Sequence, residues 1–451
     1  MPGALALGAA IVLAGCSSSS GSPTTTGSNS TSSTSGGSGQ SIPAGATINV
    51  GAISTLTGAL ASDFGGLSPG IKAYFSYINS SGGIDGHKLV LAYNLDDGGN
   101  PTQFNQLTHT VIDQDHAFAV FTASAFFSPN YYVSTGTPTY GYNVTGNWSS
   151  CTGAPLVCST PTGWPNLYGA GGNSVQYYPG GVPAYAFWLK QTHSKAAAII
   201  SYSPSIPSSY QACASAASGL KSAGYNIAYE DLGAQYAGSF NSAVQNMQQN
   251  GVGAVISCMA ETDNVTLARD IQQYGANIKQ LWLNGYDRSL LDQYKSLMQG
   301  VYLGVSGTVP YEAAEPKFGN TYPGMKLYIQ QMTKYQPSFT YNGVALQGWQ
   351  SAVLFKEGIQ KALAAGLPLT QANLVSETNK ITSDTGGGVS TVTNWSTAHT
   401  TVTYPLCSAL VQVQNGQFVV VFGKGLQVFN CFTADAKNPT PVPGEPGTPG
   451  T

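Results

Sequence analysis

The sequence predicts an α/β protein of two Rossmann-like lobes, each built on a parallel sheet, joined by a hinge that the chain crosses three times. Three observations predict this fold. Residues 47–100 show strand, helix and strand patterns in turn, and the same alternation restarts after residue 183. Residues 401–432 then form a strand pair that returns to the second lobe. Parallel strands joined by helices place their C-terminal ends at one edge of a sheet, so we expect a ligand site there.

The first strand, helix and strand have recognisable boundaries. Residues 47–53 form a short apolar run between turn signals, which is typical of a buried strand. Apolar residues then recur at helical spacing from Ile71 to Ile78, and Gly82 follows where such a helix would end. Residues 84–94 predict a turn and a second strand. Asn100 is placed to cap a helix that begins at Pro101.

Three motifs in this stretch resemble a known family. They are Val-Gly-x-x-x-x-Leu-Thr-Gly at 50–58, Asn-x-x-Gly-Gly-Ile-x-Gly-x-x-Leu at 79–89, and paired acids before Asn100-Pro101. The chain resembles the type I periplasmic-binding fold and, more narrowly, the branched-chain amino-acid (leucine/isoleucine/valine) binding proteins of ABC importers. The resemblance spans residues 47–432. It implies a substrate-binding protein whose lobes close over a small ligand, with a permease and an ATPase as partners and no cofactor.

The remaining elements follow the same alternation. Apolar spacing predicts a helix from Phe104 to Ile112, and Asn415-Gly416 predicts a tight hairpin turn. Further strands are expected at 117–121, 138–143, 196–202, 225–231, 254–258 and 280–284, with helices between them and at 322–335 and 345–363, and a hairpin from strands 406–413 and 418–422. We expect the first lobe to comprise 46–178 and 306–400, and the second 179–305 and 401–433. Residues 144–172, rich in Gly, Pro, Trp and Cys, are expected to be an insertion that forms a lid or a stabilised surface loop.

The N-terminus predicts export. Residues 4–13 are apolar but too few to span a membrane, and they lead into Leu-Ala-Gly-Cys at 13–16. This is similar to a bacterial lipobox, which would lipidate Cys16 and anchor the protein to the outer face of the cell membrane. The alternative is an ordinary signal peptide, and no Lys or Arg precedes the apolar run. Residues 17–45 and 434–451, rich in Ser, Thr, Gly and Pro, are expected to be a disordered tether and a disordered or extended tail.

Composition excludes several classes of protein. Hydrophobic residues make up 42% of the chain, which is ample for a globular core. Charged residues make up only 8%, against about 25% in a typical protein. The net charge of −3 and the lack of a Lys/Arg cluster argue against nucleic-acid binding.

Cysteine usage also predicts export. Setting Cys16 aside leaves six of the seven cysteines, without a Cys-x-x-Cys pair or a nearby histidine at ligand spacing, so disulfides are favoured over a metal site. Sequence alone leaves the pairing open. The pairing we favour joins Cys151 to Cys158, Cys213 to Cys258 and Cys407 to Cys431.

The resemblance also implies which residues bind the ligand. In the family, the loop after the third strand holds the ligand's carboxylate through hydroxyl and backbone N–H groups. Ser124 is the best match here, although Ala123 and Ala125 replace the hydroxyls that usually adjoin it, and Ser124 also fits a simple helix cap. One acid from the second lobe would bind the ammonium group, and Glu261 and Asp287 are the two that fit; each also fits a helix cap. The predicted ligand-binding set is Thr57, Phe64, Ser124, Ala125, Tyr142, Asn143, Ser208, Glu261 and Asp287.

An enzyme and a sensory receptor are the two alternatives to an importer protein. The chain lacks Gly-x-Ser-x-Gly, His-Glu-x-x-His and a phosphate-binding glycine loop, and its histidines are scattered, so the sequence predicts no enzyme. A sensory receptor of the same fold, signalling to a membrane partner, is the closer alternative, because fold alone does not decide function. The expected ligand is a small amino acid or a related amide or carboxylate.

Overall fold

The computed structural model of the protein describes residues 41–149, 151–152, 157–158, 164–170, 182–400, 406–432 and 435–440. The predicted export segment, Cys16 and most of the predicted tether lie outside these residues. The stretch at 41–45 does not: β1 (Ser41–Ile42) pairs antiparallel with β14 (Leu369–Thr370). The prediction of disorder was therefore wrong for this end of the tether, because the backbone of Ser41 and Ile42 completes a two-stranded ladder.

The first sheet is fully parallel. In the described residues it has the strand order β3 (Leu89–Asp96), β2 (Ile48–Ser54), β4 (Val120–Ala123), β5 (Thr139–Gly141) and β8 (Leu167–Gly169). Strand β8 was not predicted. It lies within 144–172, so part of that insertion is an edge strand of the sheet. The stretch also contains η2 (Gly146–Ser149) and a small ladder of β6 (Cys151–Thr152) with β7 (Val157–Cys158).

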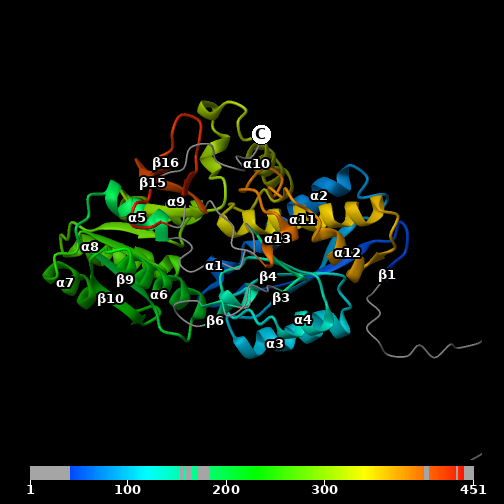
Figure 1. The fold of residues 1–451 in the computed structure, drawn as a ribbon, viewed down its shortest axis with the longest axis horizontal. Helices are drawn as coiled ribbons and strands as arrows, with labels where there is room; N and C mark the ends of the chain where they lie inside the picture. Colours follow the sequence, from blue (N-terminus) through cyan, green and yellow to red (C-terminus); the bar gives the residue numbers. More distant parts are fainter. Residues whose placement is uncertain are drawn as a thin grey trace, which may run out of the picture. The chain divides into compact units, whose positions relative to one another are not determined.

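Helices cover both faces of this sheet, as Figure 1 shows. One face carries α3 (Pro101–His109) and α4 (Asn130–Thr135), with η1 (Thr110–Gln114) continuing α3. The predicted cap is present: the Asn100 side chain accepts hydrogen bonds from the backbone N–H groups of Thr102 and Gln103. The other face carries α2 (Leu67–Ser80), α10 (Pro323–Tyr335), α11 (Gly343–Ala364) and α12 (Gln371–Thr378), with α13 (Trp395–Ala398) following.

Two glycines allow α2 and α11 to cross closely. A Cβ atom at Gly70 would lie 1.9 Å from the carbonyl oxygen of Ala345, and one at Gly348 would lie 2.1 Å from the carbonyl oxygen of Leu67. Real Cβ atoms do not approach backbone oxygens so closely, so only glycine fits at these two positions. The contact packs a helix from the first part of the chain against one from its last third.

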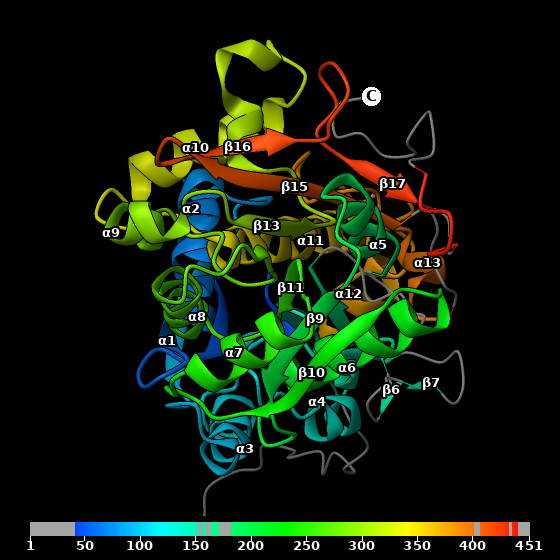
Figure 2. The ribbon, with the colours of Figure 1, turned by 90° about the vertical axis from the view of Figure 1, so that its left-hand side faces the viewer.

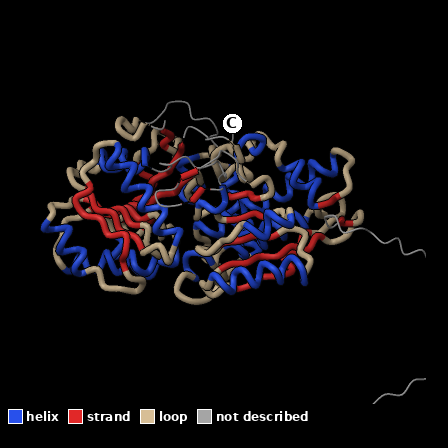
Figure 3. The backbone as a smooth tube through the Cα atoms, turned by 60° about the horizontal axis from the view of Figure 1, so that its bottom comes forward, coloured by secondary structure: helices blue, strands red, loops and turns tan. Residues whose placement is uncertain are grey.

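The second sheet is mixed. Its path in the described residues is β10 (Ile227–Ala234), β9 (Ala197–Tyr202), β11 (Ala254–Ser257), β12 (Lys279–Trp282), β13 (Tyr302–Ser306), β15 (Leu406–Gln414) and β16 (Gln417–Val421), with β17 (Asn430–Phe432) also pairing with β15. The strands up to β13 are parallel, and the C-terminal strands add antiparallel pairs. Figure 2 shows them continuing the sheet beyond β13. Its helices are α5 (Val182–Gln191), α6 (Pro207–Ser222), α7 (Asn241–Gln249), α8 (Glu261–Gln273) and α9 (Arg288–Met298). Figure 3 shows the strands in red with helices in blue beside them.

The C-terminal hairpin has the predicted turn. Asn415 and Gly416 both have positive φ, 52° and 70°, which suits the twist of a two-residue hairpin. Cys407 and Cys431, on paired strands, form a disulfide. The start of the predicted disordered tail also has ordered contacts: Ala436 is buried, and the Lys190 ammonium donates to the carbonyl oxygen of Lys437 over 3.0 Å. Residues 435–440 therefore do not fit the prediction of disorder.

Candidate functional site

A cavity of about 320 Å³ lies where loops that follow strands of the two sheets meet. The first sheet contributes the loop after β2, through α1 (Ala61–Phe64), and the loop after β5. The second sheet contributes the N-terminal ends of α6 and α8 and the loop after β12. The segment after β13 and the start of α11 close the remaining side. The volume is at the lower end of the range for small-molecule sites, about 300–1,000 Å³.

Five predicted ligand residues line this cavity. They are Phe64, Tyr142, Asn143, Ser208 and Glu261. The rings of Phe64 and Tyr142 lie 6.2 Å apart, centroid to centroid. The set includes residues from both sheets' segments, as expected for C-terminal strand ends that face one edge.

Ser124 and Ala125 are not among the lining residues. The Ser124 hydroxyl donates to Oδ2 of Asp97 over 2.5 Å and accepts the backbone N–H of Phe126. Oδ1 of the same carboxylate accepts the Thr55 hydroxyl over 2.7 Å. Asp97 is only 1% exposed. The Ser124 hydroxyl, which the family resemblance assigned to a ligand carboxylate, therefore already binds a buried carboxylate of the protein.

Thr57 also binds a carboxylate of the protein, that of the neighbouring acid Asp96, and it is not among the residues that line the cavity. The Thr57 hydroxyl donates to Oδ2 of Asp96 over 2.5 Å, and the backbone N–H groups of Leu56 and Gly98 donate to Oδ1. Burial alone would raise the pKa of Asp96, but these hydrogen bonds lower it. The paired acids at the end of β3 thus hold together two loops of the first sheet.

Asp287 caps a helix. Its Oδ1 accepts the backbone N–H groups of Ser289 and Leu290 at the start of α9, and its Oδ2 accepts the side-chain amide of Asn342 over 3.1 Å. Asp287 is 4% exposed and is not among the residues that line the cavity. Of the two interpretations that the sequence allowed for this acid, the structure shows the cap.

Asp63 lines the cavity and was missed by the sequence-based set. It lies in the short helix α1, and its Oδ1 accepts the backbone N–H of Glu261 over 3.3 Å. Its Oδ2 is buried without a hydrogen-bond partner among the described residues. The signal available in the sequence was an acid a few residues after the first strand, in the loop that already contained Phe64.

The two acids of the cavity perturb each other. Burial, followed by the nearby carboxylates of Asp263 and Asp287, raises the pKa of Asp63 to about 7, although the Glu261 N–H and the Ser62 hydroxyl oppose the shift. Burial, followed by Asp63 and Asp287, raises the pKa of Glu261 well above its usual value. Burial and the same two cavity acids also raise the pKa of Tyr142. Separating the cavity from water makes each negative charge costly, so both carboxyls are poised to accept a proton or a donor group.

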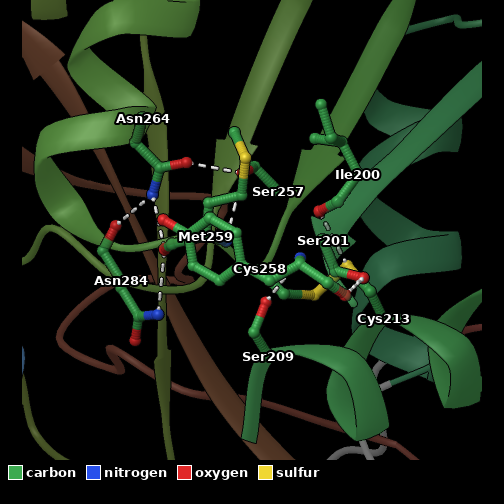
Figure 4. The surroundings of a disulfide bond; sticks show 10 residues. Ile200, Ser201, Ser209, Cys213, Ser257, Cys258, Met259, Asn264 and Asn284 are labelled. Atoms are coloured by element: carbon green, nitrogen blue, oxygen red, sulfur yellow. Dashed lines mark hydrogen bonds between the residues drawn. A yellow bond between two sulfur atoms is a disulfide. The ribbon is translucent and has the colours of Figure 1, made fainter. Parts of the chain in front are cut away.

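A disulfide supports the second-sheet side of the cavity. Cys213 of α6 is bonded to Cys258, which follows β11 and itself lines the cavity. Figure 4 shows Ser209 beside the disulfide, and Asn284 with Asn264 on the other side of Met259. The Asn264 amide donates to the carbonyl oxygens of Met259 and Asn284, and the Asn284 amide donates to Met259. The bonds hold the loop after β11 and the loop after β12 in one arrangement.

Neither a metal-binding cluster nor a membrane-spanning helix is found among the residues that the structure describes. No group of three or more His, Cys, Asp or Glu side chains there is placed to hold a metal ion. Within the same ranges, no helix combines the length and the apolar character needed to cross a membrane.

Comparisons with known proteins agree with this architecture. The family model described as periplasmic binding protein matches residues 47–417. No curated protein matches the chain significantly. Among solved structures, a fatty acid ABC transporter substrate-binding protein from Thermomonospora curvata is 16% identical to this chain. The match covers 88% of this chain and 95% of that protein's chain, with a TM-score of 0.66.

Two amino-acid receptors are similar to a comparable degree. One is the branched-chain amino acid transporter substrate-binding protein LivJ from Streptococcus pneumoniae, solved with isoleucine. It is 16% identical to this chain, and the match covers 83% of this chain and 99% of the LivJ chain with a TM-score of 0.62. A leucine-binding protein from Thermotoga maritima is 12% identical, covering 83% of this chain and 97% of its own with a TM-score of 0.62. These proteins share the fold with the chain, and their differing ligands do not specify its own.

Proposed function

Because the chain belongs to the periplasmic binding protein family and has the type I periplasmic-binding fold predicted from its sequence, we propose that it is the substrate-binding protein of an ABC importer. It captures a small molecule in the cavity lined by Asp63, Phe64 and Glu261 and delivers it to a permease and its ATPase. Members of this family bind ligands, so the chain is proposed to be a receptor and not an enzyme.

One observation supports the proposal most strongly. The cavity draws side chains from loops that follow strands of both sheets, and the Glu261 N–H contacts the Asp63 carboxylate between them. A ligand that bridges the two sides would favour the closed arrangement of the lobes, since it can bind both only when they meet. Closure would then report occupancy to the importer.

The similar proteins give a starting point for the ligand class. Amino acids, or related amides and carboxylates, are the starting hypothesis, because LivJ of Streptococcus pneumoniae was solved with isoleucine. The fatty acid ABC transporter substrate-binding protein from Thermomonospora curvata shows that proteins with the same fold bind other ligands.

The proposal includes a lipid anchor at Cys16, supported by Leu-Ala-Gly-Cys at 13–16 and the Ser-rich stretch that follows. We expect Cys16→Ala to release the protein into the medium or leave it unprocessed, as measured by fractionation and lipid labelling. A variant that stays membrane-bound and lipid-labelled would show that the lipobox interpretation is wrong.

The decisive experiment combines a binding screen with uptake. A thermal-shift screen of amino acids, amides, amines and carboxylates identifies a binder, since a ligand at 100 times its dissociation constant adds about 2.7 kcal/mol of stability. A strain lacking the gene should then fail to take up that compound in radiolabelled form. If uptake is unchanged while a transcriptional response to the compound is lost, the protein is a sensory receptor and the importer proposal fails.

A further inference from the structure

The described residues that line the cavity carry an unusual set of charges. They include two acids, Asp63 and Glu261, and no Lys, Arg or His. Each acid is only 7% exposed. The nearby Arg288 is bound to Glu312 over 3.3 Å, so it does not compensate for them. Buried carboxylates without a positive partner are costly when they are ionised, so they either hold a proton or bind a positively charged group.

Asp63 has an unused acceptor. Oδ1 receives the Glu261 N–H, while Oδ2 is buried and has no hydrogen-bond partner among the described residues. The Oε1 atom of Gln347, which also lines the cavity, is likewise buried without a partner among the described residues, so a bound molecule with donor groups would satisfy both atoms. Since Asp63 lines the cavity, the donor to its Oδ2 belongs to the ligand.

Aromatic rings complete the same site. Phe64 and Tyr142 line the cavity, and so does Tyr286, whose ring stacks on that of Tyr311 with centroids 4.6 Å apart. Aromatic faces attract organic cations, and the attraction increases when water is excluded.

A negative group on the ligand finds no cationic side chain among the described residues that line the cavity. The Ser124 and Thr57 hydroxyls, which were predicted to hold a carboxylate, already donate to Asp97 and Asp96. A ligand carboxylate placed in the cavity would instead lie near two further carboxyls. Where Asp63 and Glu261 are ionised, like charges in this desolvated site repel strongly, so the cavity then selects against an anion.

We propose that the ligand is a small organic cation with a protonated amine and no carboxylate, held between Asp63 of the first lobe and Glu261 of the second. The inference rests on the proposed receptor function and narrows its ligand class: an amine or an amino-acid amide fits, and a free amino acid or a carboxylate does not. Because one acid comes from each side of the cavity, the amine also joins the two lobes.

The test uses compounds that share one carbon skeleton. Leucine, leucinamide, 3-methylbutylamine and 4-methylpentanoate differ in which charged groups they carry, and phenylalanine, its amide, phenethylamine and 3-phenylpropionate form a second series with a larger apolar part. Calorimetry at pH 8, where Asp63 is mostly ionised, compares all eight. We expect the amines and amides in at least one series to bind at least about 10-fold more tightly than the amino acid and the acid, since each tenfold is 1.4 kcal/mol.

Variants locate the binding. Asp63→Asn and Glu261→Gln should each weaken amine binding by roughly 10- to 150-fold, the range for losing a charged hydrogen bond. Asp292→Asn is the matched control, because it removes an acid whose side chain is 70% exposed on α9 and should leave binding unchanged. Circular dichroism and thermal unfolding of each variant confirm that it is folded.

Three outcomes would overturn the inference. One is that an amino acid or a carboxylate binds as tightly as the matching amine; the receptor function then stands and only the ligand class fails. Another is that amine binding is indifferent to both Asp63→Asn and Glu261→Gln. The third is that neither series binds, or that Na⁺, K⁺ or Ca²⁺ alone stabilises the protein; the receptor proposal is then judged by the broader screen and the uptake assay.

Discussion

The carboxylate of Asp63 and the backbone N–H of Glu261 meet over 3.3 Å, one from a loop of the first sheet and the other from the first residue of α8. The N-terminus of a helix carries a partial positive charge, which favours the ionised form of Asp63. Burial and two neighbouring acids, Asp263 and Asp287, oppose it, and the net result is a raised pKa. This balance makes the contact sensitive to pH.

The stability of the unliganded protein should therefore depend on Asp63. The pKa of Asp63 rises from 3.8 to about 7 on folding. Its stabilising contribution to the free energy of unfolding is therefore fully present below about pH 4 and is lost as the pH rises through about 7. Asp63→Asn removes this loss. Urea unfolding at pH 5 and pH 8 should show the variant gaining stability over the wild type at the higher pH, by an amount on the order of 2–4 kcal/mol.

The control for this prediction is Phe64→Leu, which alters the adjacent cavity side chain without changing charge. Its stability difference from the wild type should be the same at both pH values. The carboxyl groups of Asp263 and Asp287 lie near Asp63. Glu261 also responds to the removal of Asp63, because Asp63 helps to raise the pKa of Glu261. An Asp63→Asn profile parallel to that of the wild type would show that the folded protein does not hold this carboxyl in its protonated form.

The crossing of α2 and α11 predicts a sharp steric effect. In Gly348→Ala the new methyl group would lie 2.1 Å from the carbonyl oxygen of Leu67, so the helices must move apart. We expect a loss of about 1–3 kcal/mol in the free energy of unfolding, measured with urea. Gly253→Ala is the control, because its Cβ would have no atom closer than 3.9 Å. Equal effects of the two substitutions would contradict the close crossing.

The Ser124 hydroxyl should matter for stability more than for binding. Ser124→Ala leaves Oδ2 of the buried Asp97 without this donor, which should cost about 1–3 kcal/mol. Thr57→Ala should cost less, because the Thr57 bond to Asp96 is exposed and water can replace it. Calorimetry with the strongest binder from the screen should show less than about a threefold change for Ser124→Ala. A loss of binding without a loss of stability would restore Ser124 to the ligand site.

The folded, exported protein should contain no free thiol. The structure contains the disulfides Cys213–Cys258 and Cys407–Cys431, two of the favoured pairs. The backbone of Cys151 pairs with that of Cys158 in the β6–β7 ladder, where the third pair is predicted. Thiol titration under denaturing, non-reducing conditions should give about zero per chain for the mature protein, and Cys151→Ser should give about one. Two thiols in the wild type would remove a bridge.

Local patterns were sufficient for much of the fold. The helix cap at Asn100, the hairpin turn at Asn415-Gly416 and the order of strands and helices depend on neighbouring residues and on the chirality of βαβ crossovers. The same rule placed Phe64, Tyr142 and Glu261 near one sheet edge, where they line one cavity. Such features are encoded within a few residues, so a single sequence is enough to predict them.

Tertiary structure decided what the polar side chains do. Whether Ser124, Thr57 and Asp287 were available to a ligand depended on Asp97, Asp96 and Asn342, which lie 27, 39 and 55 residues away along the chain. The pairing of β8 with β5 and the approach of Asp63 to Glu261 also join distant segments. Burial and hydrogen bonding at these sites depend on three-dimensional neighbours that no local pattern specifies, and this is why the sequence located the edge of the site while only the folded chain determined its charge.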